Sequence, residues 1–395
     1  MNVTIVGQGY VGLPLAIASA KAGYRVYGLD SNESRINQLK KGYSFIADLN
    51  QLELEIALNS NLYIPTLEEH VISDSDVILI CVPTPLNNER KPDLALLIDA
   101  CKTVGKYLPA NSLVIIESTI EPGTCRNVIL PILTQESGLN ADEFYLAYSP
   151  ERIDPSNDKW TVTNTPKVVS GYTKISAQKT LDFYSKFVDS LVECESMEVA
   201  ETAKLLENSF RLINISFINE IAIFCQKLGI DVNQVISAAA TKPYGFMPFY
   251  PSIGVGGHCI PVDPLYLANK AREIGAPTRF IELADQINQE MPGYFVGRAE
   301  EKIGRLQSKK IIVIGVSYKP NVVDVRETPV IALILGLKNK GAEVFWHDEL
   351  VQEWNGEKSI GLSGDYDLAI LATPHDYLDL TKLGNVPILN TRGSI

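Results

Sequence analysis

Residues 2–30 decide the fold, and they open with Asn2-Val3-Thr4-Ile5-Val6-Gly7-Gln8-Gly9-Tyr10-Val11-Gly12. The first five residues predict a short apolar strand that breaks at the glycines. A helix is expected from Leu13 to Ala22, with Gly23 ending it. A second strand, Arg25 to Leu29, then ends at Asp30. This order of strand, glycine turn, helix and strand is typical of the first βαβ unit of a dinucleotide-binding sheet.

The glycine turn has the GxGxxG spacing. Gly7 makes the tight turn, Gly9 lets backbone N–H groups approach a pyrophosphate, and Gly12 lets the helix pack closely on the strand. Asp30 stands where a carboxylate can bind ribose hydroxyls and would repel a 2′-phosphate, so the pattern predicts NAD rather than NADP. We expect Gln8, Tyr10 and Val11 of the same turn to contact the cofactor. Arg35 either complicates the preference for NAD or covers the adenine face. A tight turn without a ligand is the alternative for the whole motif.

Composition narrows the class of protein. The chain has 395 residues, with 35 Lys and Arg against 47 Asp and Glu, a net charge of −12. This acidic balance argues against a broad nucleic-acid interface, and no apolar run approaches the roughly 18 residues of a membrane span. The N-terminus lacks the basic start of a signal peptide. The six cysteines, at 81, 101, 125, 194, 225 and 259, form no CxxC pair, which favours reduced thiols in a cytoplasmic protein over disulfides or a metal site.

The opening pattern returns near the end of the chain. A strand from Lys310 to Ile314 precedes a loop, a helix that begins near Pro329 and a strand that ends at His347-Asp348. Residues 75–83, SDVILICVP, resemble residues 366–374, YDLAILATP. We therefore expect an α/β fold, with two Rossmann-like, doubly wound parallel-sheet domains joined by a long helix in a helical middle. The expected domains are 1–195, 196–300 and 301–395. The last lacks GxGxxG and should hold a different ligand.

The longest expected helix covers residues 196–228, with Ser196 as its N-cap and Gly229 after its end. Lys204, Asn208 and Arg211 share one face, because they are four and seven residues apart. A solvated polar stripe is one interpretation of this triplet. The apolar residues in the surrounding turns instead favour a largely buried helix, in which the lysine and arginine need an anionic ligand; these are Leu205, Leu206, Phe210, Ile213 and Ile215.

A single cysteine stands at the edge of a glycine loop, Gly254-Val255-Gly256-Gly257-His258-Cys259-Ile260-Pro261-Val262-Asp263. A buried structural thiol is the usual fate of a cysteine. The glycines on one side and Asp263 on the other favour close approach of a substrate instead, and a thiolate there could attack an aldehyde. Zinc ligation by His258 and Cys259 is disfavoured.

Polar loops follow several predicted strands, where ligands bind in parallel sheets. One runs from Ser118 to Thr124, and another includes Pro150-Glu151-Arg152. Glu151 is a candidate general base and Arg152 a candidate partner of a phosphate or carboxylate, with a surface ion pair as the alternative for both. Lys319 and Arg326 follow the first strand of the C-terminal domain, which suits a second phosphate-bearing ligand.

Taken together, these motifs resemble those of the nucleotide-sugar 6-dehydrogenases that act on UDP-glucose, GDP-mannose and UDP-N-acetylhexosamines. The resemblance covers essentially the whole chain through GxGYVG at 7–12, VPTP at 82–85, STxxPGT at 118–124, SPER at 149–152, AExxKLxEN at 200–208, GGHCxPxDP at 256–264 and YKPNVxDxRE at 318–327. It implies NAD contacts from Pro83, Thr84, Ser118 and Thr119, and an Arg326 that closes over the cofactor.

The resemblance also implies a reaction. In that group a hydride passes from the sugar C6 hydroxyl to NAD, and the cysteine, here Cys259, attacks the resulting aldehyde. A second NAD oxidises the thiohemiacetal to a thioester, and water releases the uronic acid. Lys204 and Asn208 would stabilise the oxyanion, Asp263 would assist Lys204 or Cys259, and Glu151 with Thr119 would position the water. The implied substrate-binding residues are Glu151, Arg152, Lys204, Asn208, Arg211, Phe249, Tyr250, Gly256 and Lys319, and the long helix resembles the core of a homodimer.

Departures from the glucose-specific pattern indicate the substrate. Those members typically carry PEFL followed by an acid, whereas this chain has Pro150-Glu151-Arg152-Ile153-Asp154-Pro155. GGHCIPVDP and ENSFR resemble the N-acetylhexosamine branch. We therefore favour UDP-N-acetylglucosamine or UDP-N-acetylmannosamine, oxidised for surface polysaccharide synthesis, over UDP-glucose. Lys242 is the nearest counterpart of the substrate arginine that the family carries upstream of the cysteine loop.

Two other functions compete. A two-electron dehydrogenase of the hydroxyacid or 6-phosphogluconate type shares the dinucleotide motif and a Lys…Asn helix, but it gives Cys259 no function. A catalytically inactive NAD-binding sensor is disfavoured, because every candidate catalytic position is occupied.

Overall fold

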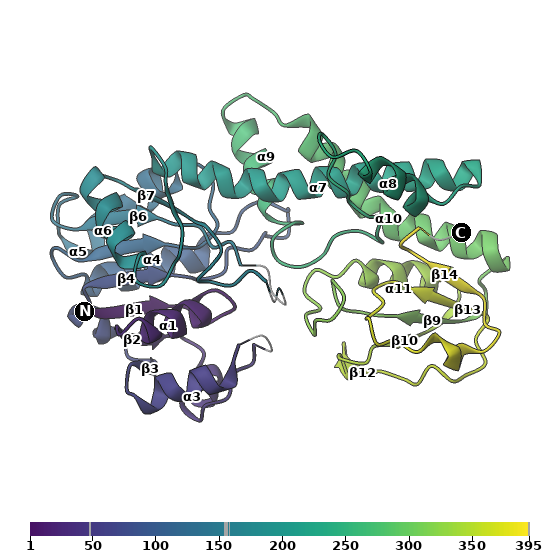
Figure 1. Cartoon of the computed structure of the whole chain (residues 1–395), viewed down its shortest axis with the longest axis horizontal. Coiled ribbons are helices and arrows are strands. Elements are labelled where there is room, and N and C mark those ends of the chain that lie inside the picture. The colour runs from purple at the N-terminus through teal and green to yellow at the C-terminus, as the bar shows by residue number, and fades with distance from the viewer. Residues whose placement is uncertain (47–48, 154–156, 158, 394–395) are drawn as a thin grey trace. The chain divides into compact units, whose positions relative to one another are not determined.

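The computed structural model describes residues 1–46, 49–153, 157 and 159–393. The chain divides into two compact units, Met1–Leu206 and Glu207–Ile395 (Figure 1). The helix α7, Met197–Leu228, begins in the first unit and continues in the second. The three-domain division expected from the sequence stays a prediction.

The first unit is built on one eight-stranded sheet in the order β3-β2-β1-β4-β5-β6-β7-β8. Every neighbouring pair is parallel except β6 and β7. The strands are β1 Asn2–Val6, β2 Arg25–Leu29, β3 Tyr63–Thr66, β4 Val77–Ile80, β5 Leu113–Ile116, β6 Tyr145–Tyr148, β7 Lys167–Gly171 and β8 Leu191–Glu193. The first six strands have the order of a dinucleotide-binding fold, which places the ends of β1, β2, β4 and β5 where such a ligand binds.

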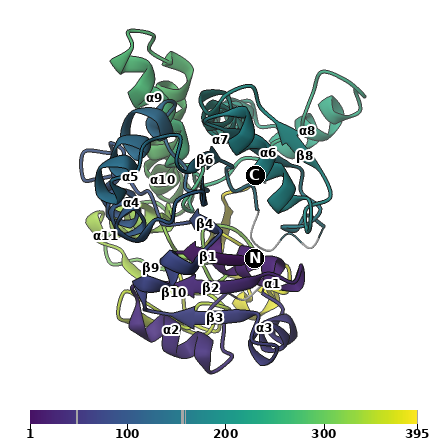
Figure 2. The same ribbon diagram turned by 90° about the vertical axis from the view of Figure 1, so that its left-hand side faces the viewer.

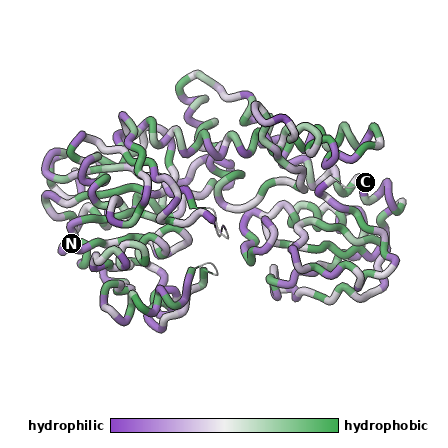
Figure 3. The backbone as a smooth tube through the Cα atoms, viewed as in Figure 1, coloured by the Kyte–Doolittle hydropathy of each residue, from purple (hydrophilic) through white to green (hydrophobic). Residues whose placement is uncertain are grey.

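Helices cover both faces of this sheet (Figure 2). They are α1 Gly12–Lys21, α2 Glu33–Lys40, α3 Gln51–Asn59, α4 Ala95–Tyr107, α5 Leu130–Ser137 and α6 Lys174–Tyr184, with short turns η1 Glu69–Asp74 and η2 Cys125–Ile129. Successive strand residues point to opposite faces, so Leu79 packs with α1 and α6, whereas Ile78 packs with α4 and α5. Apolar residues therefore follow one another along the buried strands (Figure 3).

The second unit contains a four-stranded parallel sheet in the order β10-β9-β13-β14. Its strands are β9 Lys310–Ile314, β10 Glu343–His347, β13 Leu368–Leu371 and β14 Ile388–Asn390, and β11 Glu353–Trp354 pairs with β12 Glu357–Lys358. The helices are α8 Val232–Ala240, α9 Asp263–Glu273, α10 Arg279–Ile303 and α11 Val330–Asn339, with a short turn η3 Leu380–Leu383. Two Rossmann-like sheets and a long helix confirm the predicted fold class.

The repeat seen in the sequence is a structural repeat. Gly7 has φ +92°, and a Cβ there would lie 2.7 Å from the carbonyl oxygen of Cys81 after β4. Gly315 has φ +82° and would meet the carbonyl oxygen of Thr373 after β13 in the same way. In each sheet the next backbone N–H donates to an aspartate after the second strand: Gln8 to Asp30 at 2.7 Å, and Val316 to Asp348 at 2.8 Å.

The expectation that the long helix is largely buried holds for one side of the helix only, where Leu205 and Leu212 are fully buried. Leu206 is 60% exposed and Phe210 45% exposed, and Arg211 is also exposed. The apolar residues form two faces, of which one is buried within the chain and the other is largely exposed. No helix in the described part of the chain is both long and apolar enough to cross a membrane.

Candidate active site

The three glycines of the first turn have different surroundings. A Cβ on Gly12 would lie 1.8 Å from the carbonyl oxygen of Gly7, so helix α1 can approach β1 only with glycine there. A Cβ on Gly9 would meet no protein atom within 4 Å. The chain therefore leaves open the space beside Gly9, where the pyrophosphate of a dinucleotide is expected. This arrangement fits an NAD site.

The other residues of the turn lie on its inner side. Gln8 is fully buried, its Nε2 donates to the carbonyl oxygen of Ile5 at 2.8 Å, and its Oε1 accepts from the Tyr63 hydroxyl at 2.7 Å. Tyr10 and Val11 are half-buried and pack against the core on the α1 side of the sheet. The Gln8 side chain therefore stabilises the turn from the protein interior, and the side of the turn that would face the ligand is formed by the backbone.

Asp30 lies directly after β2 and is 7% exposed. One carboxylate oxygen accepts hydrogen bonds from the Gln8 N–H and from Arg35 Nη1, both at 2.7 Å, and the other accepts the Asn32 N–H at 2.8 Å. The Arg35 guanidinium also lies 5.0 Å from the centre of the Phe45 ring. Arg35 thus neutralises Asp30 at the position where ribose hydroxyls are expected.

The loops after β4 and β5 are tied together by two side chains. The Thr84 hydroxyl donates to the carbonyl oxygen of Thr119 at 2.8 Å, and the Ser118 hydroxyl donates to that of Val82 at 2.7 Å. Thr84 and Ser118 are buried, Thr119 is half-buried and Pro83 is exposed. The four residues therefore come together at one edge of the sheet, as the sequence predicts.

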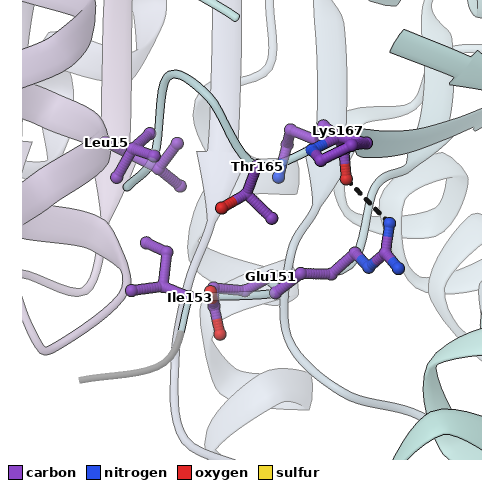
Figure 4. A pocket seen from close by; sticks show the side chains of 8 residues that line it. Leu15, Glu151, Ile153, Thr165 and Lys167 are labelled. Carbon is purple, nitrogen blue, oxygen red and sulfur yellow. Dashed lines mark hydrogen bonds between the residues drawn. The ribbon is translucent and has the colours of Figure 1, made fainter. Parts of the chain in front are cut away.

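A small pocket lies beside the loop that follows β6 (Figure 4). Its lining residues come from that loop, from the first residue of β7 and the segment before it, and from α1: Leu15, Glu151, Arg152, Ile153, Val162, Thr165, Pro166 and Lys167. Arg152 Nη1 donates to the carbonyl oxygen of Pro166 at 2.7 Å. Asp154 and Pro155, which help to predict the substrate from the sequence, lie outside the described residues.

The polar residues of helix α7 lie on both sides of Leu206, the last residue of the first unit. Lys204 is 6% exposed, which agrees with the expected buried cation. One turn later, Asn208 Nδ2 donates to Asp263 Oδ2 at 2.6 Å, and both residues are buried. Arg211 is exposed, so the argument that it needs a buried anionic partner does not hold.

Cys259 is the one exposed thiol among the six. Its carbonyl oxygen accepts the backbone N–H groups of Val262 at 3.2 Å and Asp263 at 2.8 Å, which places it one turn before α9. Burial raises the pKa of Cys101 to about 12 and raises the pKa of Cys81 and Cys125 as well. Access to solvent therefore singles out Cys259 as the candidate nucleophile.

The loop that bears Cys259 is held from two directions. The Val255 N–H donates to Asn288 Oδ1 on α10 at 2.6 Å. The Gly257 N–H donates to the carbonyl oxygen of Arg326 at 3.0 Å, and a Cβ on Gly256 would lie 2.7 Å from the carbonyl oxygen of Glu327. Only glycine allows this close packing, so the thiol loop and the segment that contains Arg326 are one packed assembly.

The remaining predicted ligand residues lie in two places of the second unit. Arg326 Nη2 is 2.6 Å from Asp324 Oδ2, and the Lys319 carbonyl accepts the Ser317 hydroxyl at 2.9 Å. Phe249 packs edge to face on Phe210, with 5.8 Å between ring centres, while Tyr250 is 56% exposed.

His258 is half-buried in the same loop. Burial lowers the pKa of its imidazole, and the nearby Arg326 lowers that pKa further, so the ring is neutral near pH 7. No group of His, Cys, Asp and Glu side chains that could hold a metal ion occurs in the described part of the chain.

Two buried clusters were not predicted. Lys167 pairs with Glu117, and His375 pairs with Asp348 at 3.1 Å. His375 Nδ1 also accepts the Asn321 N–H at 2.8 Å. Asp348 could have been found from its place after the second strand of the repeat, but neither basic partner carries a local signal.

Family models match almost the whole chain. They describe the UDP-glucose/GDP-mannose dehydrogenase family: its NAD binding domain matches residues 1–188, its central domain residues 198–290 and its UDP binding domain residues 312–389. The chain belongs to the UDP-glucose/GDP-mannose dehydrogenase family. The resemblance drawn from the motifs is confirmed, as are NAD as cofactor and the class of NAD-dependent nucleotide-sugar dehydrogenase. The match to the UDP binding domain supports a UDP-sugar as substrate.

Relatives of this dehydrogenase include UDP-N-acetylhexosamine enzymes. It is 37% identical to protein CapL of Staphylococcus aureus, with coverage of 96% of this chain and 92% of the relative. It is 36% identical to UDP-N-acetyl-D-glucosamine 6-dehydrogenase of Salmonella typhi, with 95% and 90% covered. The solved structure of a UDP-D-ManNAc dehydrogenase from Pyrococcus horikoshii has a TM-score of 0.92 at 31% identity, with 99% of this chain and 95% of that chain covered.

Proposed function

We propose that the enzyme oxidises the C6 hydroxyl of a UDP-N-acetylhexosamine to a carboxylate, in two hydride transfers and one hydrolysis. The observation that carries this proposal is the exposed Cys259 thiol in a loop packed on the segment of Lys319 and Arg326. A simple two-electron dehydrogenase has no use for such a thiol. NAD supplies the acceptor for both hydrides when it is bound at the glycine turn.

In the proposed reaction, Lys204 and Asn208 bind the C6 oxygen as it gains negative charge. The Cys259 sulfur adds to the aldehyde carbon and forms a C–S bond. Loss of the second hydride leaves a thioester. Glu151, with Thr119, positions a water, and Glu151 takes a proton from it. This water attacks the thioester carbon, the C–S bond breaks, and the thiol is restored. For each sugar, one water and two NAD⁺ are consumed, one carboxylate and two NADH are formed, and three protons, including that of the C6 hydroxyl, pass to the solvent.

The hydrogen bond from Asn208 to Asp263 supports this assignment. It fixes the amide so that Oδ1 of Asn208 accepts and the remaining Nδ2 hydrogen donates. Asp263 therefore orients Asn208, and its direct assistance to Lys204 or Cys259 stays part of the proposal. Lys319 and the loop at Phe249 and Tyr250 are proposed to bind the UDP moiety.

The preferred substrate is UDP-N-acetylglucosamine or UDP-N-acetylmannosamine. The similarity to enzymes named for both sugars supports this choice, as do the SPER and GGHCIPVDP motifs. UDP-glucose is the second candidate. A role in surface polysaccharide synthesis and a cytoplasmic location remain predictions from the sequence.

A homodimer through α7 is part of the proposal. Phe210, Phe217 and Phe224 are spaced by seven residues and are 45%, 56% and 57% exposed. Side chains at this spacing form one seam along a helix. A second copy of the same helix offers a matching apolar face.

The test is the number of NADH formed per sugar consumed, with a panel of UDP-glucose, UDP-N-acetylglucosamine, UDP-N-acetylmannosamine, UDP-N-acetylgalactosamine and GDP-mannose. We expect a ratio of two with an acetylated glucose or mannose derivative. A ratio of two with UDP-glucose alone would overturn the choice of substrate. A ratio of one would overturn the thioester route.

A further inference from the structure

Lys167 is a buried cation that none of the family motifs contains. It begins β7, and its Nζ lies 2.8 Å from Glu117 Oε2 and 3.5 Å from the carbonyl oxygen of Pro150. The Tyr184 hydroxyl donates to the other carboxylate oxygen of Glu117, and the Tyr184 ring centre lies 4.9 Å from Nζ. The side chains of Lys167 and Glu117 are 9% and 0% exposed.

The two acceptors of Lys167 lie at the ends of neighbouring strands. Glu117 follows β5 and directly precedes Ser118-Thr119, whereas Pro150 follows β6 and directly precedes Glu151. One ammonium group therefore joins the two loops that carry Thr119 and Glu151. Lys167 also lines the same pocket as Glu151 (Figure 4).

A second bond strengthens the same joint. The Ser149 hydroxyl donates to the carbonyl oxygen of Val168 at 2.7 Å, next to Lys167 on β7. Charged hydrogen bonds are strong in a buried site and costly to break, because water cannot replace the lost partner. Burial and the neighbouring Glu117 raise the pKa of Tyr184, so its hydroxyl stays a donor.

We propose that Lys167 is a positioning residue for hydrolysis: its ammonium, through Glu117 and Pro150, sets the distance between Thr119 and Glu151. This inference rests on the proposed function, in which those two residues position the water that attacks the Cys259 thioester. The two oxidations need no such water. Loss of Lys167 should therefore slow the release of the acid more than the formation of NADH in the first turnover.

The variant is Lys167→Met, with Lys186→Met, an exposed lysine just beyond α6, as the matched control. Because Lys167→Met leaves Glu117 buried without its cation, the double variant Glu117→Gln/Lys167→Met is made as well. We expect both Lys167 variants to form two NADH per active site in a rapid first turnover. Their steady-state rate should then be lower than that of the wild type by at least about tenfold, since small misplacements of reacting groups have effects of this size.

Intact mass spectrometry during the steady state should show the uronyl thioester on Cys259 of the Lys167 variants. Lys186→Met should behave as the wild type. Equal losses in the first turnover and in the steady state, with no thioester, would overturn the inference, because they indicate general damage. An unchanged steady-state rate in the double variant would overturn it as well.

Hydrogen–deuterium exchange tests the connection between the loops of Thr119 and Glu151 without an activity assay. Peptides covering 117–121 and 149–153 should exchange faster in the double variant than in the wild type, while the strands β1 and β2 stay protected. Unchanged exchange in both peptides would contradict the inference. The ratio of NADH to sugar in the wild type tests the proposed function separately. Failure of the proposed function can therefore be distinguished from failure of the inference about Lys167.

Discussion

Cys259 differs from the other five cysteines in its access to solvent. We expect iodoacetamide to modify Cys259 first, because the buried thiols Cys81, Cys101 and Cys125 have raised pKa values and form little thiolate. Half-buried Cys194, whose pKa burial also raises, should follow more slowly. Peptide mapping after brief labelling measures the order. Earlier modification of Cys194 than of Cys259 would contradict the assignment.

Replacement of the thiol should stop the formation of acid. In Cys259→Ser the nucleophile becomes an alcohol, which is hardly ionised near pH 7. Net acid production should therefore fall by much more than about tenfold. Product analysis by chromatography measures the acid, and Cys194→Ser is the control. Wild-type turnover in Cys259→Ser would remove the covalent route.

At the scale of elements, two glycines of the first turn affect different properties. Gly12 affects the stability of the fold, and Gly9 affects the binding of NAD. In Gly12→Ala the new methyl group would meet the carbonyl of Gly7, and we expect a loss of roughly 1–3 kcal/mol of stability, which is typical of overpacking. Gly9→Ala meets no protein atom and should keep the wild-type melting temperature, yet it should weaken NAD binding because the methyl group occupies the space for the pyrophosphate. Thermal unfolding and calorimetric titration with NAD measure both. Equal NAD affinity in Gly9→Ala would place the cofactor elsewhere.

The second sheet offers a test by pH. Burial alone would raise the pKa of Asp348, but hydrogen bonds from His375 and from backbone N–H groups outweigh it and hold that pKa below its ordinary value. Because the folded pKa is the lower one, this stabilisation is present above the unfolded value of about 4 and is lost as the pH falls through the folded value. Asp348→Asn should therefore cost about 1–3 kcal/mol at pH 7.

Urea unfolding of the wild type and of Asp348→Asn measures this difference at pH 7 and at pH 3. The gap between the two proteins should shrink at the lower pH, and exposed Asp365→Asn serves as the control. A gap that stays constant with pH would show that the charge of Asp348 contributes nothing.

Local patterns predicted much of the fold and only part of the site. The GxGxxG turn, the strand from Arg25 to Leu29 and the cap at Ser196 depend on neighbours in sequence, and the structure confirms them. The pair of Lys167 and Glu117 spans 50 residues and depends on the order of the strands. No spacing rule brings such partners together, because the sheet does.

Burial is the property that the sequence predicted least well. A buried thiol is the usual expectation for a cysteine taken alone, and the structure shows Cys259 to be exposed. The apolar residues of α7 indicated a buried helix, but a sequence does not distinguish a face covered by the same chain from one left for a partner. The prediction that Arg211 is buried was wrong for the same reason.

At the scale of the whole molecule, the exposed face of α7 predicts the assembly. Phe217→Asp places a charge in the middle of the proposed seam, and burying an unpaired charge there costs several kcal/mol. We expect a homodimer in the wild type and a monomer in the variant by light scattering after gel filtration. Ile175→Asp on α6, where the native side chain is 60% exposed, is the control. A dimeric Phe217→Asp would exclude this face.

Each compact unit is a continuous stretch of chain, and this has a consequence for synthesis on the ribosome. All eight strands of the larger sheet precede residue 194, so that sheet can be completed while the second unit is still being translated. Helix α7 leaves the ribosome next, with its apolar seam still uncovered. We therefore expect nascent chains of this enzyme to be most in need of a chaperone after the first sheet has formed and before two copies meet.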